Sequence, residues 1–207
     1  MGKNCRICNI IEDEKGEYGL LDKPFYKQAN YASVVSIGAF IEGWTLIFSK
    51  EHKYNLHNDY NSIEFYNYLK KHISLVRKKL KWDRKIIAFE HGANKCDSLT
   101  ACGTSHAHLH IVPFDGSILS RIKNRKEWTK CKWREAEDIV GEKEYLLYSE
   151  TPELGKDAEV YINIVSIPES QYFRRILAEE IGLCGEYSYK ENPRVEQSMK
   201  VRKMFKE

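Results

Sequence analysis

The sequence predicts an α+β fold, and three observations lead to this class. Two strand-like runs at residues 31–37 and 44–50 are joined by a short segment in which Gly38 and Gly43 can supply turn geometry. A long helical pattern follows them, and further strand-like runs follow the helix. Strands that occur in groups, with helices between or after the groups, are typical of α+β chains.

The helical pattern begins near Asn58 or Asp59, either of which can act as its N-cap. Apolar residues then recur at steps of three and four, which places them on one side of a helix: Ile63, Tyr66, Leu69, Ile73, Val76 and Leu80. This stripe predicts packing against the core, and the opposite side of the helix is basic.

A strand-like run at residues 85–91 is followed by the polar loop 92–103, which contains glycine and leads directly into a histidine-rich run. If the two runs form antiparallel strands, the loop backbone lies beside the histidines. Free N–H groups of such a loop can converge on a phosphate, so the loop is a candidate anion cradle.

The histidine-rich run is SHAHLHIVPF at residues 105–114. Alternate side chains of a strand lie on the same face, so His106, His108 and His110 share one face at intervals of about 6.6 to 7 Å. The intervening residues are apolar, as in a half-buried strand: Ala107, Leu109 and Ile111. Three aligned imidazoles indicate a site for metal binding or for nucleophilic catalysis.

The second half of the chain has its own elements. Strand-like runs at residues 144–149 and 159–166 precede a helix at residues 168–182, capped near Pro168 or Ser170. We therefore predict a core domain at residues 1–115 and a C-terminal α/β extension at residues 116–207, which contributes to the active site or to a dimer.

Composition excludes several classes of protein. The 207 residues are 30% charged and 42% hydrophobic, which is ordinary for a folded domain, and the net charge of +3 is too small to indicate a partner. The sequence has no apolar run of roughly 18 residues and no signal-peptide core at its start, so we predict a cytoplasmic protein without a membrane partner. Six cysteines in a reducing compartment favour thiols or a metal site over disulfides.

Four sequence features together resemble the histidine triad (HIT) family over residues 1–115, about half of the chain. HAHLHIV fits the triad motif itself, and LIFSKEH is similar to the strand that ends in Lys-x-His. FEHG matches the residues before the loop into the triad, and CRIC resembles the CxxC near the start of many prokaryotic members.

This resemblance implies a small antiparallel sheet with a helix packed against it, usually in a homodimer. It also implies an enzyme that binds a nucleotide or nucleotide conjugate and hydrolyses or transfers its nucleoside monophosphoryl group. The middle histidine, His108, would attack the α-phosphorus and form a nucleotidyl-histidine intermediate, while His110, Thr104 and Ser105 would hold the phosphoryl group. Glu90 stands where the family often has Asn or Gln reaching the substrate.

The chain departs from the family pattern at two places. Residues 101–103 (ACG) lack the amide that relatives carry before the triad, and Ser36 stands where an Asp usually holds the ribose hydroxyls. The helix at residues 168–182 is a source of substitutes, because Gln171 can replace the missing amide and Arg174 can bind phosphate through its guanidinium.

Cys5 and Cys8 have the C-x2-C spacing of a zinc site. In family members with this CxxC, the remaining ligands are the His after the Lys and the first triad histidine, here His52 and His106. The resemblance therefore implies a closed Cys2His2 site in which zinc is structural.

Two other functions remain open. The segment at residues 121–134 is basic and contains Trp128 and Trp133, so it could contact nucleic acid through phosphate neutralisation and base stacking, although the low net charge does not favour this. Alternatively, His106, His108 and His110 could bind one catalytic zinc, but three consecutive same-face positions of one strand strain a tetrahedral site.

Overall fold

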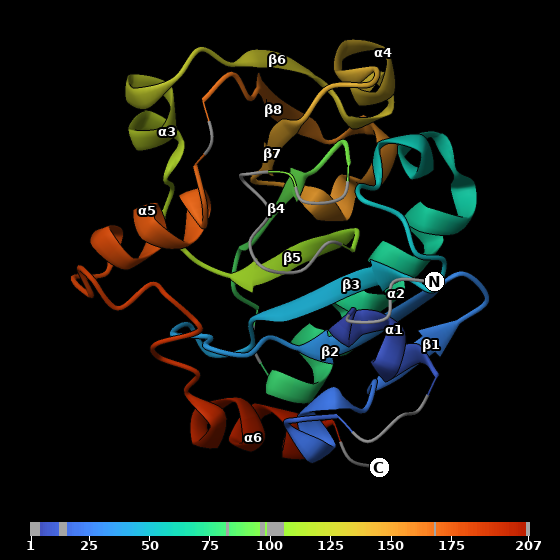
Figure 1. Ribbon diagram of the computed structural model, residues 1–207, viewed down its shortest axis with the longest axis vertical. Helices are drawn as coiled ribbons and strands as arrows, with labels where there is room; N and C mark the ends of the chain where they lie inside the picture. Colours follow the sequence, from blue (N-terminus) through green and yellow to red (C-terminus); the bar gives the residue numbers. More distant parts are fainter. Residues whose placement is uncertain are drawn as a thin grey trace.

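The computed structural model describes residues 5–12, 16–81, 83–95, 98, 106–167 and 169–205. Within them the chain forms one eight-stranded sheet in the order β1-β2-β3-β5-β4-β7-β8-β6, with antiparallel neighbours throughout (Figure 1). The strands are β1 Tyr26–Gln28, β2 Tyr31–Val35, β3 Thr45–Ser49, β4 Ile86–Gly92, β5 His108–Pro113, β6 Thr129–Lys132, β7 Tyr145–Ser149 and β8 Glu159–Ile164.

Helices connect and cover these strands, which confirms the predicted α+β class. The α-helices are α1 Arg6–Ile11, α2 Ile63–Leu80, α3 Leu119–Arg125, α4 Ala136–Val140, α5 Tyr172–Glu180 and α6 Val195–Met204. Short 3-10 helices are η1 Gly19–Asp22, η2 His57–Asn61, η3 Trp133–Glu135 and η4 Pro152–Asp157. None of the helices among the described residues combines the length and apolar character needed to cross a bilayer.

Helix α2 begins later than the sequence predicts. Residues 57–61 form η2, so neither Asn58 nor Asp59 is the cap, and Ser62 instead accepts a hydrogen bond from the Phe65 N–H at 3.4 Å. The predicted stripe is otherwise buried, from Tyr66 to Leu80, but Ile63 at the first helical position is 76% exposed. The stripe packs on the face of the sheet that carries Leu109 and Ile111.

The two faces of the sheet have different coverings. Figure 1 shows α1 over one face and α2 behind the other. The α1 face carries Leu46 and Phe48, which pair in register with His110 and His108 of β5. Helix α5 packs near these residues through an apolar cluster that includes Phe89 and Phe173. The alternation along β5 therefore separates its histidines from the α2 core, as the sequence predicts.

The segment after residue 116 continues the same sheet. Strand β7 pairs with β4 from Ala88 opposite Ser149 to Gly92 opposite Tyr145, and β8 and β6 follow outward. Both large apolar clusters contain residues from the two sides of the predicted domain boundary. The C-terminal segment thus shares its core with residues 1–115 and brings α5 to the histidine face.

Candidate active site and metal centre

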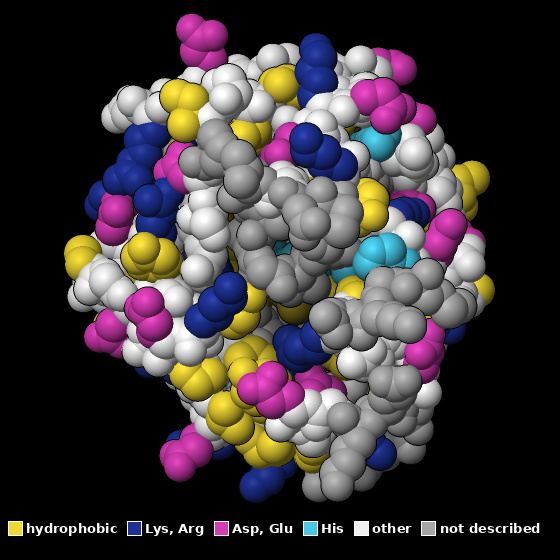
Figure 2. All heavy atoms as spheres, in the orientation of Figure 1, with side chains coloured by type: hydrophobic (Ala, Val, Ile, Leu, Met, Phe, Trp, Pro, Cys, Tyr) yellow, Lys and Arg dark blue, Asp and Glu magenta, His cyan; other side chains and the backbone are white. Residues whose placement is uncertain are grey.

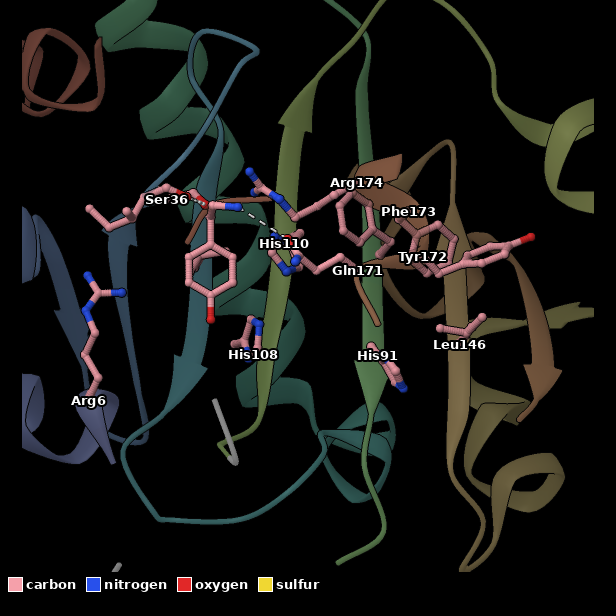
Figure 3. Close-up of a pocket in the computed structure, with 14 residues that line it drawn as sticks. Arg6, Ser36, His91, His108, His110, Leu146, Gln171, Tyr172, Phe173 and Arg174 are labelled. Atoms are coloured by element: carbon pink, nitrogen blue, oxygen red, sulfur yellow. Dashed lines mark hydrogen bonds between the residues drawn. The ribbon is translucent and has the colours of Figure 1, made fainter. Parts of the chain in front are cut away.

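A pocket lies between the histidine face of the sheet and helix α5 (Figure 3). His108 and His110 of β5 enter it from the sheet, and Gln171 and Arg174 enter it from α5. The structure therefore brings together four of the residues that the sequence proposes for catalysis and substrate binding. Ser36, the position at which the sequence resemblance predicts a ribose contact, also lines this pocket.

The tautomer of His108 follows from its hydrogen bond. Its Nδ1 lies 2.8 Å from the backbone carbonyl oxygen of His106, which can only accept, so Nδ1 carries the proton and donates it. The neutral ring then has its lone pair on Nε2. Burial lowers the pKa of His108, which favours this neutral form.

His110 has the opposite tautomer. The indole Nε1–H of Trp44 can only donate, and it lies 2.9 Å from His110 Nδ1, so this nitrogen is the acceptor and Nε2 carries the proton. Phe89 stacks on the ring at a centroid distance of 4.5 Å, and burial holds the pKa of His110 well below its usual range. The pocket thus receives one imidazole nitrogen that can attack and one N–H that can donate.

Arg174 is held firmly in the pocket wall. It is 5% exposed, donates from Nε to the Tyr187 carbonyl oxygen at 2.8 Å and from Nη2 to the Gly38 carbonyl oxygen, and lies 4.7 Å from the Trp44 ring centroid. Gln171 is the N-cap position of α5 with φ of 55°, and its Oε1 accepts a hydrogen bond from the Tyr189 N–H at 3.4 Å. These contacts reduce the freedom of both side chains.

Arg6 is a pocket residue that the sequence reasoning missed. It lies between the two cysteines of the CRIC segment, and its Nε donates to the buried Asp22 carboxylate at 3.0 Å. Its guanidinium also lies 5.0 Å from the Tyr18 ring centroid. Its place inside the CxxC segment was the available signal, since that segment was already expected to lie beside the first triad histidine.

The placement of Glu90 does not support its predicted role in substrate binding. Its side chain is fully buried on the α2 face, where it accepts hydrogen bonds from the Leu56 N–H at 2.9 Å and from the hydroxyls of Tyr60 and Tyr145. Burial raises its pKa to about 7. The β4–β5 register puts Phe89 opposite His110, so odd-numbered residues of β4 face the pocket, and the neighbouring His91 lines it instead.

Thr104 and Ser105, the remaining predicted phosphate ligands, lie outside the described residues.

Cys5, Cys8, His52 and His106 form a cluster whose ligand atoms all lie within 4.8 Å of one another. His106 Nδ1 is 3.4 Å from Cys5 Sγ and 3.6 Å from Cys8 Sγ, and His52 Nδ1 is 3.2 Å from Cys8 Sγ. His106 Nε2 lies 2.7 Å from the Ser49 carbonyl oxygen and donates to it, which leaves the Nδ1 lone pair facing the thiols. These spacings suit four ligands about one tetrahedral ion, so the cluster could hold a metal.

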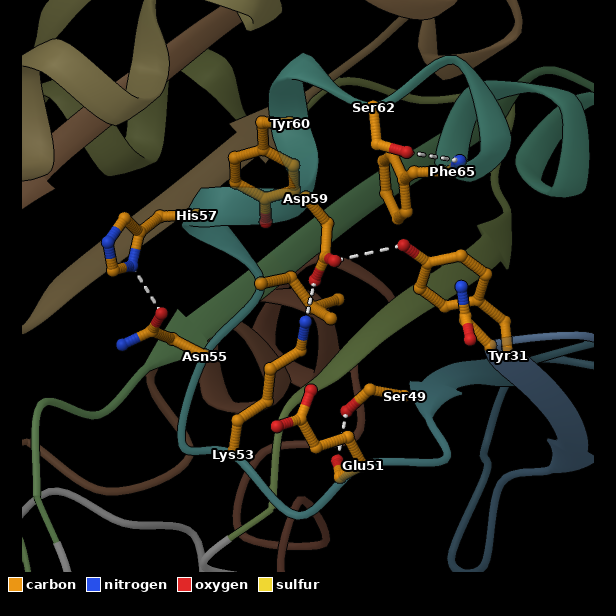
Figure 4. A network of polar contacts seen from close by, with 12 residues as sticks. Tyr31, Ser49, Glu51, Lys53, Asn55, His57, Asp59, Tyr60, Ser62 and Phe65 are labelled. Atoms are coloured by element: carbon orange, nitrogen blue, oxygen red, sulfur yellow. Dashed lines mark hydrogen bonds and ion pairs between the residues drawn. The ribbon is translucent and has the colours of Figure 1, made fainter.

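Polar contacts fix the segment that carries His52 (Figure 4). Asp59 accepts hydrogen bonds from Lys53 and from the Tyr31 hydroxyl, the latter at 2.9 Å. The carbonyl oxygen of Lys53 accepts from the Ala107 N–H at 2.6 Å, which ties the segment to the residues just before β5. The segment that carries His52 is therefore fixed next to the strand that carries His108 and His110.

This arrangement opposes a catalytic zinc held by all three histidines. His106 precedes β5 and directs Nδ1 towards the two cysteines, while a Trp44 hydrogen bond occupies Nδ1 of His110. His108 and His110 therefore face the pocket, whereas His106 belongs to the Cys/His cluster.

Most cations of the basic segment at residues 121–134 are paired with carboxylates, and its two tryptophans pack against the protein. Figure 2 shows Lys and Arg side chains gathered over α3 with acidic side chains among them. Five cations of residues 121–134 form ion pairs: Arg121 with Glu180, Arg125 with Glu179, Lys126 with Glu169, Lys130 with Glu159 and Arg134 with Asp157. Trp133 is fully buried, and Trp128 donates its N–H to the Ile122 carbonyl oxygen at 2.9 Å. Paired cations and packed indoles favour a structural role for this segment.

No protein-family model and no curated protein matches this sequence. Three solved structures show partial similarity. A Hit-like protein involved in cell-cycle regulation from Bartonella henselae, solved with an unknown ligand, is 19% identical over 55% of this chain and 77% of its own, with a TM-score of 0.39. A hypothetical histidine triad nucleotide-binding protein from Sulfolobus tokodaii is 21% identical over 55% and 71%, with a TM-score of 0.37. The yeast Ap4A phosphorylase in complex with Ap4A is 12% identical over 87% and 73%, with a TM-score of 0.38. Similarities at these TM-scores do not establish a function. The functional proposal therefore depends on the geometry of the site itself.

Proposed function

We propose that the chain is a nucleotide hydrolase or nucleotidyltransferase that cleaves at the α-phosphate through a nucleotidyl intermediate on His108. The observation that carries this proposal is the pair of opposite tautomers in one pocket. His108 offers the Nε2 lone pair, and His110 offers an Nε2–H donor two residues along the same strand face. A nucleophile beside a fixed donor is the arrangement that two-step phosphoryl transfer requires.

In the first step, His108 Nε2 attacks the α-phosphorus and the bond to the leaving group breaks. The charge on the phosphoryl oxygens is met by the N–H of His110 and by the guanidinium of Arg174, whose orientations the protein fixes beforehand. In the second step, water or an acceptor attacks the phosphorus and the Nε2–P bond breaks. Imidazole is a good leaving group near neutral pH, so this route divides one difficult displacement into two easier ones.

We further propose that the four-residue cluster binds zinc in a structural role. Cys5, Cys8, His52 and His106 would provide four protein ligands and leave no open position, so the ion would supply cross-linking rather than Lewis-acid chemistry. It would hold α1, and with it Arg6, against the strand that carries His108. The predicted phosphate contacts of Thr104 and Ser105 stay predictions.

The test is turnover of a panel that contains nucleoside phosphoramidates, dinucleoside polyphosphates and nucleotide sugars. Replacement of His108 by Ala should lower turnover of any accepted substrate by at least 1,000-fold, the order expected when a nucleophile is lost. His57→Gln is the matched control, because His57 contacts Asn55 and does not line the pocket. Near-normal turnover by a folded His108→Ala protein would refute the proposal.

A further inference from the structure

A further imidazole lies beside the proposed nucleophile. Strands β4 and β5 pair in a register that aligns Phe89 with His110. The paired part of the two strands ends there, and the same register continued by two residues places His91 level with His108 on the same face. Both residues line the pocket, and Figure 3 shows them at the same level on neighbouring strands.

The C-terminal half of the chain orients this imidazole. Glu144, immediately before β7, lies 2.8 Å from His91 Nε2 through Oε1, and its Oε2 accepts a hydrogen bond from Ser98. Burial raises the pKa of Glu144, but the hydrogen bonds from His91 and Ser98 outweigh it and leave the pKa below its usual value. Glu144 is therefore a carboxylate that accepts the Nε2 proton of His91 and can stabilise the ring when it becomes charged.

A histidine held by a carboxylate beside a nucleophile is an arrangement suited to general acid–base catalysis. The proposed reaction at His108 needs such a group, because an alcohol, phenol or amine leaving group must gain a proton and an attacking water must lose one. His110 does not meet this need, since its Nδ1 accepts from Trp44 and its Nε2–H is assigned to the phosphoryl oxygens.

We propose that His91 is the proton-transfer residue of the site and that Glu144 positions it. This inference rests on the proposed function. In the first step, His108 Nε2 bonds to phosphorus, the bond from phosphorus to the leaving atom breaks, and the imidazolium of His91 gives its proton to that atom. In the second step, a water oxygen bonds to phosphorus, the Nε2–P bond breaks, and the now neutral His91 takes the water proton. The cycle returns both histidines to their starting states.

The test compares two esters of the same nucleoside 5′-monophosphate that differ in their need for an acid. A 4-nitrophenyl group leaves readily as its anion, whereas an unsubstituted phenyl group depends more strongly on protonation. His91→Gln should slow the first release of phenol by about 100-fold or more, and the first release of 4-nitrophenol by less than about 10-fold. With the nitrophenyl ester the variant should also accumulate the His108 adduct, because the second step lacks its base.

Glu144→Gln should show the same dependence on the leaving group with a smaller loss, because an amide can still accept from Nε2–H but does not stabilise the charged ring. Glu142→Gln is the matched control, since Glu142 is an exposed residue two positions before Glu144. Equal slowing of both esters by His91→Gln, or no slowing of either, would overturn the inference. Turnover that survives in His108→Ala would instead refute the proposed function, so the two failures are distinguishable.

Discussion

Replacement of Glu90 by Gln is expected to remove a large part of the pH dependence of folding. The fully buried carboxyl of Glu90 accepts hydrogen bonds from two tyrosine hydroxyls and one backbone N–H. None of these three partners is a cation. Burial raises its pKa from 4.5 to about 7. Gln has nearly the same shape as a protonated Glu and carries no charge at any pH.

Proton linkage sets the sign and the size of the change in unfolding free energy with pH. Below pH 4.5 the carboxyl is protonated in both the folded and the unfolded chain. Between pH 4.5 and about 7 the folded chain keeps a proton that the unfolded chain loses, so the free energy of unfolding falls as the pH rises. Above pH 7 both states are charged and the loss is complete. The difference between the two pKa values corresponds to about 3 kcal/mol, at 1.36 kcal/mol per pH unit.

Urea denaturation of the metal-loaded protein at several pH values measures this effect. Because other titrating groups cancel between the two proteins, the difference in unfolding free energy between Glu90→Gln and the unaltered chain should increase by about 2 to 3 kcal/mol from pH 5 to pH 8. The exposed Glu142→Gln should show no such trend. A difference that is constant across this range would show that the reasoning about the buried carboxyl is wrong.

Three further changes test other parts of the account. Trp44→Phe removes the indole N–H that donates to His110 Nδ1, so kcat/KM should fall about fivefold and ¹⁵N NMR should detect a mixture of His110 tautomers; a single unchanged tautomer would contradict the assignment. Arg174→Lys cannot keep the guanidinium contacts with two carbonyl oxygens, and kcat/KM should fall at least about tenfold, measured against Lys123→Ala as a surface control; equal activities would argue against a role for Arg174. Cys8→Ser should lower the zinc content from about one ion per chain and should also lower Tm. If the unaltered protein is as stable without metal as with it, the ion has no structural role.

The local features of the fold could be predicted from the sequence. The α2 stripe and the alternation around His108 and His110 depend on the periods of helices and strands, and these are set by backbone geometry. The exact start of α2 could not be predicted, because Asp59 and Ser62 are both good caps and the η2 turn decides between them.

Features that depend on the pairing of strands could not be predicted from the sequence. A shift of one residue along β4 decides whether Glu90 or His91 faces the pocket. Only the register with β5 fixes this position. Glu144 enters the site because β7 pairs with β4, although 53 residues separate it from His91. The sequence separation carries no signal of such a contact, so the partner of His91 emerged only from the fold.

The same pairing changes how the C-terminal half should be tested. Truncation after Gly116 would remove β7 and α5 together, and with them apolar residues of both large clusters. The remaining chain would expose the β4 edge and lose six of the fourteen residues that line its pocket, so loss of activity would follow from loss of the fold. Single substitutions at Arg174 and Glu144 address the contribution of this half to the site more directly.

The central claim is that Nε2 of His108 forms a covalent bond to phosphorus, and rapid-quench mass spectrometry tests it most directly. A 4-nitrophenyl ester of a nucleoside 5′-monophosphate should charge the enzyme within one turnover, and peptide mapping should place one nucleoside monophosphate on His108. The adduct should be absent from His108→Ala and present in His57→Gln, which lies outside the pocket. An adduct on another residue, or turnover by a folded His108→Ala protein, would contradict the account.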